Sequence, residues 1–318
     1  MKDRLIIVAP CYNEATTLPK SSALFLEQIK ILIQTKKISS KSRILFVDDG
    51  SQDNTWEIIQ ELAKKDQHFI GIRQSRNRGH QNAVLAGFME AKDNCDIAIS
   101  IDCDGQDDIS TIPAMVQAYQ EGAEVVYGVR NSRKSDSVFK RNSAKMFYKL
   151  LHLMGVESVS NHADYRLVSN RALQELANFK EVNLFLRGLF PLIGFKTAKV
   201  YYDRKPRIDG KSHYSLRKMF AFALDGITSF SIRPIRLILF FGALASFIGL
   251  CGIIYIFASF ISGNVVSGWT SLALIVCFFG GVQTLSLGII GEYIGKVYLE
   301  TKARPRYIIS ERTYKRKP

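Results

Sequence analysis

Cysteine is scarce in this chain, and its spacing excludes two kinds of structural site. Five cysteines are scattered through the 318 residues with no Cys-x-x-Cys pair: Cys11, Cys95, Cys103, Cys251 and Cys277. This pattern excludes a disulfide framework and a cysteine-based zinc site, and it indicates a reducing compartment. No signal peptide is predicted, because the first apolar run, Leu5–Ala9, is too short to be one.

Charge is missing from one long segment, since no charged residue occurs between Leu237 and Gly291. The segment divides at Ser262-Gly263-Asn264, and each half exceeds the roughly 20 apolar residues that cross a bilayer. It predicts two transmembrane helices, at about 235–261 and 269–294. The loop between them lacks lysine and arginine, whereas both flanks are rich in them. We therefore expect a multi-pass plasma-membrane protein with both termini and the N-terminal domain in the cytoplasm.

The chain divides into four predicted regions. They are a cytoplasmic α/β domain, amphipathic helices in the membrane interface, two transmembrane helices and a basic cytoplasmic tail, at residues 1–210, 211–234, 235–297 and 298–318. A stripe of small residues in the second membrane segment, Gly288, Gly291 and Gly295, favours helix packing. On that basis we expect a homo-oligomer formed through the membrane helices.

The balance of charge favours anionic partners. The formal net charge is +14, from 43 Lys and Arg against 29 Asp and Glu. Basic and aromatic residues do not interleave in a known nucleic-acid-binding motif, so we expect a lipid bilayer and phosphorylated substrates as partners, and no nucleic acid. The basic segment Arg130–Lys149 is either a contact with phosphate or lipid, or an ordinary solvated helix face.

Apolar runs alternate with helical patterns up to residue 202, which is typical of right-handed βαβ units in a mostly parallel sheet. We predict strands at 5–9, 43–47, 69–72, 96–101, 125–127 and 196–202. Helices are predicted between these strands, and further helices at 161–171 and 183–193. The candidate N-caps of the helix after the second strand are Ser51, Asp53 and Thr55.

Two aspartates, Asp102 and Asp104, directly follow the fourth predicted strand. Ligands of open α/β sheets bind beyond the carboxyl ends of the strands, where these side chains should lie. Carboxylate oxygens suit Mg²⁺ or Mn²⁺, which takes further ligands from water and from substrate phosphates. The pattern predicts a metal–diphosphate site, with an acidic turn of no special function as the alternative.

Six segments, taken in order, resemble the family 2 glycosyltransferases, whose GT-A fold is a Rossmann-like α/β domain. The segments are Pro10-x-Tyr12-Asn13-Glu14, Asp48-Asp49-Gly50-Ser51-x-Asp53-x-Thr55, Asp102-x-Asp104-x-Gln106-Asp107, Gly128-x-Arg130-x-x-Arg133, Asp164-Tyr165-Arg166-Leu167 and Arg204-x-x-Arg207-x-x-Gly210-Lys211-Ser212-His213-Tyr214. Within this family the chain is similar to polyprenyl-phosphate glycosyltransferases of the GtrB and dolichyl-phosphate-mannose synthase type. The Gln-x-x-Arg-Trp motif of processive polysaccharide synthases is absent, which argues against chain polymerisation.

The resemblance implies a role for each matching residue. The nucleotide would be bound by Pro10, Tyr12, Asn13, Glu14, Asp48, Asp49 and Asp102. The metal would be bound by Asp102, Asp104 and Gln106. The acceptor phosphate would meet Arg130, Arg133, Arg166, Arg204, Arg207, Lys211 and Ser212. The catalytic candidates are Asp104, Arg130 and Asp164, the last acting either as a base or as a group that only orients the acceptor.

The implied reaction is inverting transfer of a sugar from UDP-glucose or UDP-GlcNAc to polyprenyl (undecaprenyl) phosphate at the cytoplasmic membrane face. A diphosphate leaving group needs neutralisation of its charge, which the Mg²⁺ or Mn²⁺ would supply. The acceptor phosphate is already ionised near neutral pH, so arginines that bind it matter more than a strong base. Two other functions stay open: a membrane-anchored nucleotide-binding scaffold without turnover, and transfer to another lipid acceptor such as diacylglycerol.

Overall fold

The computed structural model describes residues 2–131, 162–203, 231, 233–262 and 268–315. Within these residues the strands are β1 (Leu5–Cys11), β2 (Arg43–Asp48), β3 (Phe69–Gln74), β4 (Ile97–Ser100), β5 (Val125–Arg130), β6 (His162–Ser169), β7 (Thr197–Tyr202) and β8 (Ile309–Arg312). They form one sheet in the order β7-β5-β6-β4-β1-β2-β3-β8. The predicted α/β domain with a mostly parallel sheet is therefore confirmed, because β1 pairs in parallel with β2 and β4, and β2 with β3.

Helices pack on both faces of this sheet. Their bounds are α1 (Leu18–Gln34), α2 (Thr55–Lys65), α3 (His80–Ala91), α4 (Ile112–Gln120), α6 (Asn170–Leu176) and α7 (Leu186–Ile193), with a short 3₁₀ turn, η1 (Ile109–Thr111), before α4. Alternate residues of β1 enter two different cores, since Ile7 packs with α1, α2 and α4, whereas Val8 packs with α3, α6 and α7. A strand buried on both faces reads as a continuous apolar run, which is why Leu5–Ala9 was recognisable in the sequence.

The predicted helix at 161–171 is wrong, because His162–Ser169 is strand β6. This strand lies antiparallel between β4 and β5. Its side chains alternate between the two cores, with Leu167 on one face and Val168 on the other. A period of two is a strand pattern, and the helix begins only at Asn170, where the Ser169 hydroxyl accepts a hydrogen bond from the amide of Ala172. The predicted helix at 183–193 is confirmed as α7, beginning three residues later.

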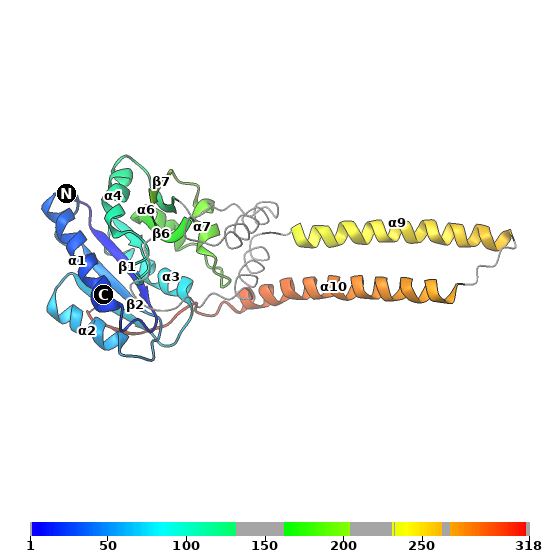
Figure 1. Ribbon diagram of the computed structural model, residues 1–318, viewed down its shortest axis with the longest axis horizontal. Helices are drawn as coiled ribbons and strands as arrows, with labels where there is room; N and C mark the ends of the chain where they lie inside the picture. Colours follow the sequence, from blue (N-terminus) through cyan, green and yellow to red (C-terminus); the bar gives the residue numbers. More distant parts are fainter. Residues whose placement is uncertain (1, 132–161, 204–230, 232, 263–267, 316–318) are drawn as a thin grey trace.

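Two long helices extend from the α/β domain side by side (Figure 1). They are α9 (Arg233–Ile261) and α10 (Trp269–Lys302), which coincide with the two predicted membrane segments. Many of their apolar side chains are exposed, for example Leu239 and Phe247. Among the residues that the structure covers, no helix meets the combined length and hydropathy of a membrane span, so the crossing itself stays a prediction. Nearly all of the predicted interfacial region at 211–234 lies outside the described residues.

The C-terminal region is more than a basic tail, because β8 returns from α10 and pairs antiparallel with β3. The Arg312 guanidinium contacts both carboxylate oxygens of Glu90 on α3, at 2.9 and 3.1 Å. The hydroxyl of Tyr314 donates to the same carboxylate, and the indole N–H of Trp56 donates to Glu311. These contacts complete the edge of the sheet with residues from the far end of the chain.

We expect Arg312→Ala to lower the free energy of unfolding by about 1–3 kcal/mol, because it removes two charge-assisted hydrogen bonds from a buried carboxylate. Thermal unfolding of the purified protein in detergent measures the change. Lys65→Ala is the matched control, since Lys65 forms an exposed i,i+4 pair with Glu61 at 3.8 Å. The control should change stability by less than about 0.5 kcal/mol, and equal effects of the two substitutions would contradict a structural role for β8.

Candidate functional site

The sheet topology brings several polar segments to one edge. Strands β1 to β4 share a direction, and β5 shares it too because β6 runs antiparallel to both β4 and β5. The carboxyl ends of these strands therefore meet the amino end of β6. As a result Asp102, which follows β4, and Asp164, the third residue of β6, lie at the same edge.

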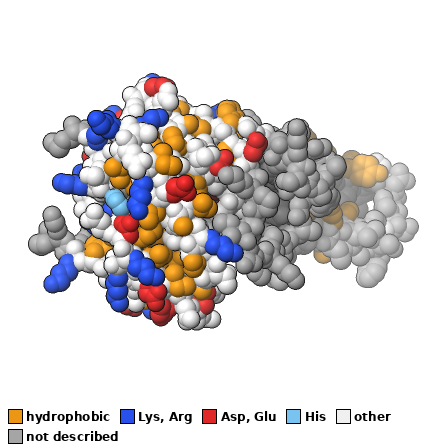
Figure 2. All heavy atoms as spheres, turned by 60° about the vertical axis from the view of Figure 1, so that its left-hand side comes forward, with side chains coloured by type: hydrophobic (Ala, Val, Ile, Leu, Met, Phe, Trp, Pro, Cys, Tyr) orange, Lys and Arg blue, Asp and Glu red, His pale blue; other side chains and the backbone are white. Residues whose placement is uncertain are grey.

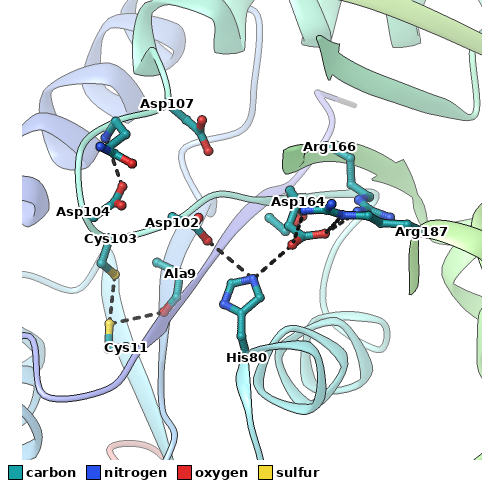
Figure 3. A network of polar contacts seen from close by, with 12 residues as sticks. Ala9, Cys11, His80, Asp102, Cys103, Asp104, Asp107, Asp164, Arg166 and Arg187 are labelled. Atoms are coloured by element: carbon teal, nitrogen blue, oxygen red, sulfur yellow. Dashed lines mark hydrogen bonds and ion pairs between the residues drawn. The ribbon is translucent and has the colours of Figure 1, made fainter. Parts of the chain in front are cut away.

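A histidine that sequence reasoning missed lies between these two aspartates (Figure 3). The Nε2 atom of His80 is 3.5 Å from Oδ1 of Asp102 and 3.4 Å from Oδ2 of Asp164. Asp164 also contacts two arginines, with NH2 of Arg166 at 2.8 Å from Oδ1 and NH2 of Arg187 at 3.2 Å from Oδ2. Cations from α3, β6 and α7 thus converge on Asp164, and the histidine also reaches Asp102 in the loop after β4.

This arrangement shifts the pKa values of the groups involved. Burial alone would raise the pKa of Asp164, but Arg187, His80 and Arg166 together hold it well below its usual range. Burial raises the pKa of Asp102 to about 6, with Asp107 and Asp104 adding to the rise and His80 opposing it. For His80, burial acts to lower the pKa, but Asp102 and Asp164 outweigh it and raise the value to about 9. Asp164 is consequently a stable carboxylate that is suited to orienting a partner rather than to taking up a proton.

The loop after β4 carries the predicted metal ligands. Oδ1 of Asp104 accepts a hydrogen bond from the amide of Gln106 at 3.0 Å, which fixes the turn around Gly105. Further along, the buried Asp107 contacts Arg130 at the end of β5, with NH2 at 3.2 Å from Oδ1. Arg130 also donates from Nε to the hydroxyl of Tyr202 at 3.2 Å. The loop that holds Asp104 is therefore tied to Arg130, a predicted acceptor-phosphate residue whose side chain is one-quarter exposed.

The first loop is held by side chains from the loop after β2. Ser51 Oγ accepts from the amide of Asn13 at 3.0 Å, and Thr55 Oγ1 accepts from the amide of Glu14 at 2.9 Å. Asp53 Oδ2 accepts from the amide of Ala15 at 3.2 Å. Asn54, which was not among the predicted caps, directly precedes α2 and its own side chain makes no capping hydrogen bond. Of the three predicted caps, Asp53 does accept from the first amide of α2, that of Thr55, at 3.1 Å. Oxygens of all three residues also bind the backbone of the predicted nucleotide loop.

The remaining predicted nucleotide-binding residues differ in their exposure. Tyr12 is exposed, whereas Pro10 is buried at the end of β1. Asp48 is fully buried, where it accepts from the amide of Ser51 at 2.9 Å and pairs with Arg73 at 3.2 Å. These contacts give Asp48 a role in shaping the turn. The exposed side chain of Tyr12 remains accessible to the nucleobase of a nucleotide.

Asp49 fixes the turn that leads into α3. Its two carboxylate oxygens accept from the amides of Arg78 and Gly79, at 2.8 and 2.9 Å. Gly79 has φ of 87°, a conformation that favours glycine, and His80 is the next residue and the first of α3. Two segments of the site, the loops after β2 and β3, are therefore connected through Asp49.

Arg166, a predicted acceptor-phosphate residue, is buried beside Asp164. Its side chain is 1% exposed, and NH2 contacts Asp164 at 2.8 Å. Its guanidinium carbon lies 4.6 Å from the centre of the Phe190 ring. Burial against an aromatic ring and a carboxylate makes Arg166 a support for Asp164, which sequence alone does not reveal. The other predicted phosphate-binding residues lie outside the described part of the chain: Arg133, Arg204, Arg207, Lys211 and Ser212.

Two residues of the site have weak signals in the sequence. His80 follows the third strand of the sheet at its carboxyl edge, and that position was the available clue. Arg187 lies in the predicted helix at 183–193, but its approach to Asp164 depends on how α7 packs across β6. Elsewhere at this edge, Sγ of Cys11 lies 2.9 Å from Sγ of Cys103, so β1 and the loop after β4 are in contact through two buried side chains.

The carboxylates of Asp102 and Asp104 are chemically suited to a divalent cation, although they are only two ligands. Among the described residues, no group of three or more His, Cys, Asp or Glu side chains forms a complete metal site. Asp102 and Asp104 are close enough that the charge of Asp104 raises the pKa of Asp102. Two hard oxygen donors with excess negative charge suit Mg²⁺ or Mn²⁺ when substrate phosphates and water complete the coordination.

A sheet edge that joins hard oxygen donors to partly exposed arginines suits an enzyme acting on phosphorylated substrates. Residues 6–177 match the family described as Glycosyl transferase family 2. The chain belongs to glycosyl transferase family 2 and is a glycosyltransferase.

Relatives match nearly the whole length of the chain. The Bacillus subtilis (strain 168) protein named Uncharacterized glycosyltransferase YkoT is 47% identical over 305 residues, covering 96% of this chain and 90% of the relative. Bactoprenol glucosyl transferase of Shigella phage SfX is 36% identical, covering 97% of this chain and 99% of the relative. Among solved structures, mannosyltransferase PcManGT from Pyrobaculum calidifontis in complex with GDP-Man and Mn²⁺ is 15% identical, with a TM-score of 0.49, covering 94% of this chain and 85% of that one.

We expect Arg166→Ala to lower the free energy of unfolding by about 1–3 kcal/mol, because it removes a charge-assisted hydrogen bond from Asp164, which keeps Arg187 and His80 as partners. Thermal unfolding in detergent measures this loss. Arg171→Ala is the matched control, since Arg171 is mostly exposed and lies 3.6 Å from Glu124. It should cost less than about 1 kcal/mol. An unchanged stability of Arg166→Ala, with weaker acceptor binding, would return Arg166 to the phosphate-binding group.

Proposed function

We propose that this glycosyltransferase moves a sugar from UDP-glucose or UDP-GlcNAc to polyprenyl phosphate at the cytoplasmic face of the plasma membrane, with inversion at the anomeric carbon. The observation that carries the proposal is the meeting of Asp102 and Asp164 at one sheet edge with His80 between them. The relatives named bactoprenol glucosyl transferase support a polyprenyl acceptor, because they match almost the full chain.

On the donor side, Asp102 and Asp104, with Gln106 next to them, would hold a Mg²⁺ or Mn²⁺ ion. When bound, this ion supplies positive charge to the diphosphate as the bond to the sugar breaks. The first loop, fixed by Ser51 and Thr55, would receive the nucleotide beside the exposed Tyr12. On the donor side, the protein therefore holds the carboxylates of Asp102 and Asp104 and the first loop in fixed positions relative to one another.

On the acceptor side, Asp164 would orient the phosphate headgroup rather than accept its proton. Its pKa lies well below the usual range because Arg187, His80 and Arg166 surround it, and the acceptor phosphate is already ionised. The attacking phosphate and the leaving diphosphate are both anions, so cations must lie near their meeting point. Arg130 and Arg187 are two partly exposed arginines near these carboxylates, paired with Asp107 and Asp164.

The character of α9 and α10 supports the proposed attachment to a bilayer. Their side-by-side course carries exposed apolar residues away from the α/β domain, and the segment 237–291 has no charge. By contrast, lysine and arginine are interspersed with acidic residues on the face of the domain in Figure 2. A Cβ at Gly288, Gly291 or Gly295 would meet nothing within 4 Å, which leaves that stripe open to a neighbouring helix.

One incubation tests the proposal directly. Purified protein is given UDP-glucose or UDP-GlcNAc with undecaprenyl phosphate, and in a parallel arm with diacylglycerol, in the presence of Mn²⁺. Mass spectrometry of the lipid fraction should show a polyprenyl-monophosphate sugar. A glycosylated diacylglycerol would move the proposal to another acceptor, and no lipid-linked sugar from any donor would favour a binding scaffold.

Asp104→Ala should leave the protein folded and lower its transfer rate by at least about 100-fold, because one of two hard oxygen donors is lost. Transfer of radiolabelled sugar to lipid measures the rate, and thermal unfolding reports on the fold. Asp108→Ala is the control, since Asp108 lies in the same loop and accepts from the amide and hydroxyl of Ser110. Full activity of Asp104→Ala in the presence of a chelator would rule out the metal.

Arg207→Ala should raise the KM for polyprenyl phosphate about 10-fold or more while changing the donor KM little, because one phosphate-binding cation is lost. Initial rates at varied acceptor and varied donor separate the two constants. Arg171→Ala serves as the control for loss of an arginine outside the site. An unchanged acceptor KM would remove Arg207 from the acceptor site.

A further inference from the structure

His80 occupies a position from which one nitrogen reaches both halves of the site. Nε2 is 3.5 Å from Asp102 and 3.4 Å from Asp164, on carboxylates that come from different strands (Figure 3). Both distances are longer than a strong hydrogen bond, in which donor and acceptor lie about 2.9 Å apart. An N–H at this point can be shared by the two carboxylates or shift from one to the other.

The backbone around His80 is built to hold this position. Asp49 accepts from the amides of Arg78 and Gly79, so the residues just before His80 cannot shift freely. Farther along α3, Gly87 packs so closely on the sheet that a Cβ there would lie 2.2 Å from Cγ1 of Val8. The helix is therefore seated on β1 and β2, with its first residue at the sheet edge.

We propose that His80 is a positioning residue that links the metal-binding carboxylate of Asp102 to the acceptor-side carboxylate of Asp164 through its Nε2–H. The inference rests on the proposed function and deepens it, because it assigns a role to His80, a residue outside the six matched segments. Without the donor, two carboxylates face each other at this edge with less to orient them. Asp102 would then present its oxygens to the metal less well, and Asp164 would keep only its arginine partners as described above.

The Nε2–H can be tested apart from the ring that carries it. His80→Ala removes the donor. His80→Gln keeps an N–H at about the same distance from the backbone as Nε2. In His80→Asn the side chain is too short for its N–H to reach the two carboxylates. Loss of a group that orients a metal ligand typically costs about 10–100-fold in metal affinity or activity. We therefore expect His80→Ala and His80→Asn to weaken Mn²⁺ binding and kcat by about 10-fold or more, with His80→Gln recovering much of both.

The experiment measures Mn²⁺ binding to the full-length protein with UDP present, by electron paramagnetic resonance of free Mn²⁺, alongside kcat and both KM values. Mn²⁺ affinity reports on Asp102 without turnover, and a fall in kcat with a small change in acceptor KM distinguishes positioning from loss of acceptor binding. His68→Gln is the matched control, because Nδ1 of His68 bonds the carbonyl of Ser42 at 2.8 Å, outside the site. It should behave like the unaltered protein.

The outcomes separate the two proposals. Unchanged Mn²⁺ affinity and kcat in His80→Ala overturn the role of His80, whatever the reaction is. If the unaltered protein makes no lipid-linked sugar, the proposed function is overturned. If His80→Ala nevertheless weakens Mn²⁺ binding, the link between His80 and Asp102 is kept. If His80→Ala does not fold, the comparison of His80→Gln with His80→Asn decides, and equal behaviour of the two overturns the proposal.

Discussion

Charge balance at one edge of the sheet is the constraint on which the rest of the site depends. Asp102, Asp104, Asp107 and Asp164 gather there because the sheet brings together segments that are far apart in the chain. Carboxylates held this close repel one another unless cations intervene. Histidine from α3 and arginines from β5, β6 and α7 meet that need, and each has an identifiable partner.

The same balance explains how the site divides into two functions. Among the described residues, Asp164 contacts His80, Arg166 and Arg187 and its pKa lies well below the usual range, whereas Asp102 contacts His80 and has a raised pKa. The excess of negative charge therefore lies on the side of Asp104, where a divalent cation with a nucleotide diphosphate would complete it. In the proposed reaction, an incoming phosphate would meet Arg187 beside Asp164 and Arg130 beside Asp107.

Sequence reasoning captured what depends on local pattern. Continuous apolar strands such as β1, the acidic pair after β4 and the long apolar segments could be predicted, because neighbouring residues determine each of them. Strand β6 was assigned wrongly, since its insertion between β4 and β5 is a property of the whole sheet. The motif around Arg166 predicts a contact with the acceptor phosphate, whereas its burial against the Phe190 ring depends on tertiary packing. The contact of His80 with two distant carboxylates has the same origin, as no local spacing encodes it.

The return of the chain to β3 has a consequence for how the protein is made. Strand β8 comes after α10, so the helical hairpin is inserted within the sequence of the sheet rather than appended to it. During synthesis, β3 can pair with β8 only after both long helices have been made, because β8 follows α10 in the chain. An open strand edge is prone to wrong pairing, so this edge of the sheet is protected only once β8 has been added.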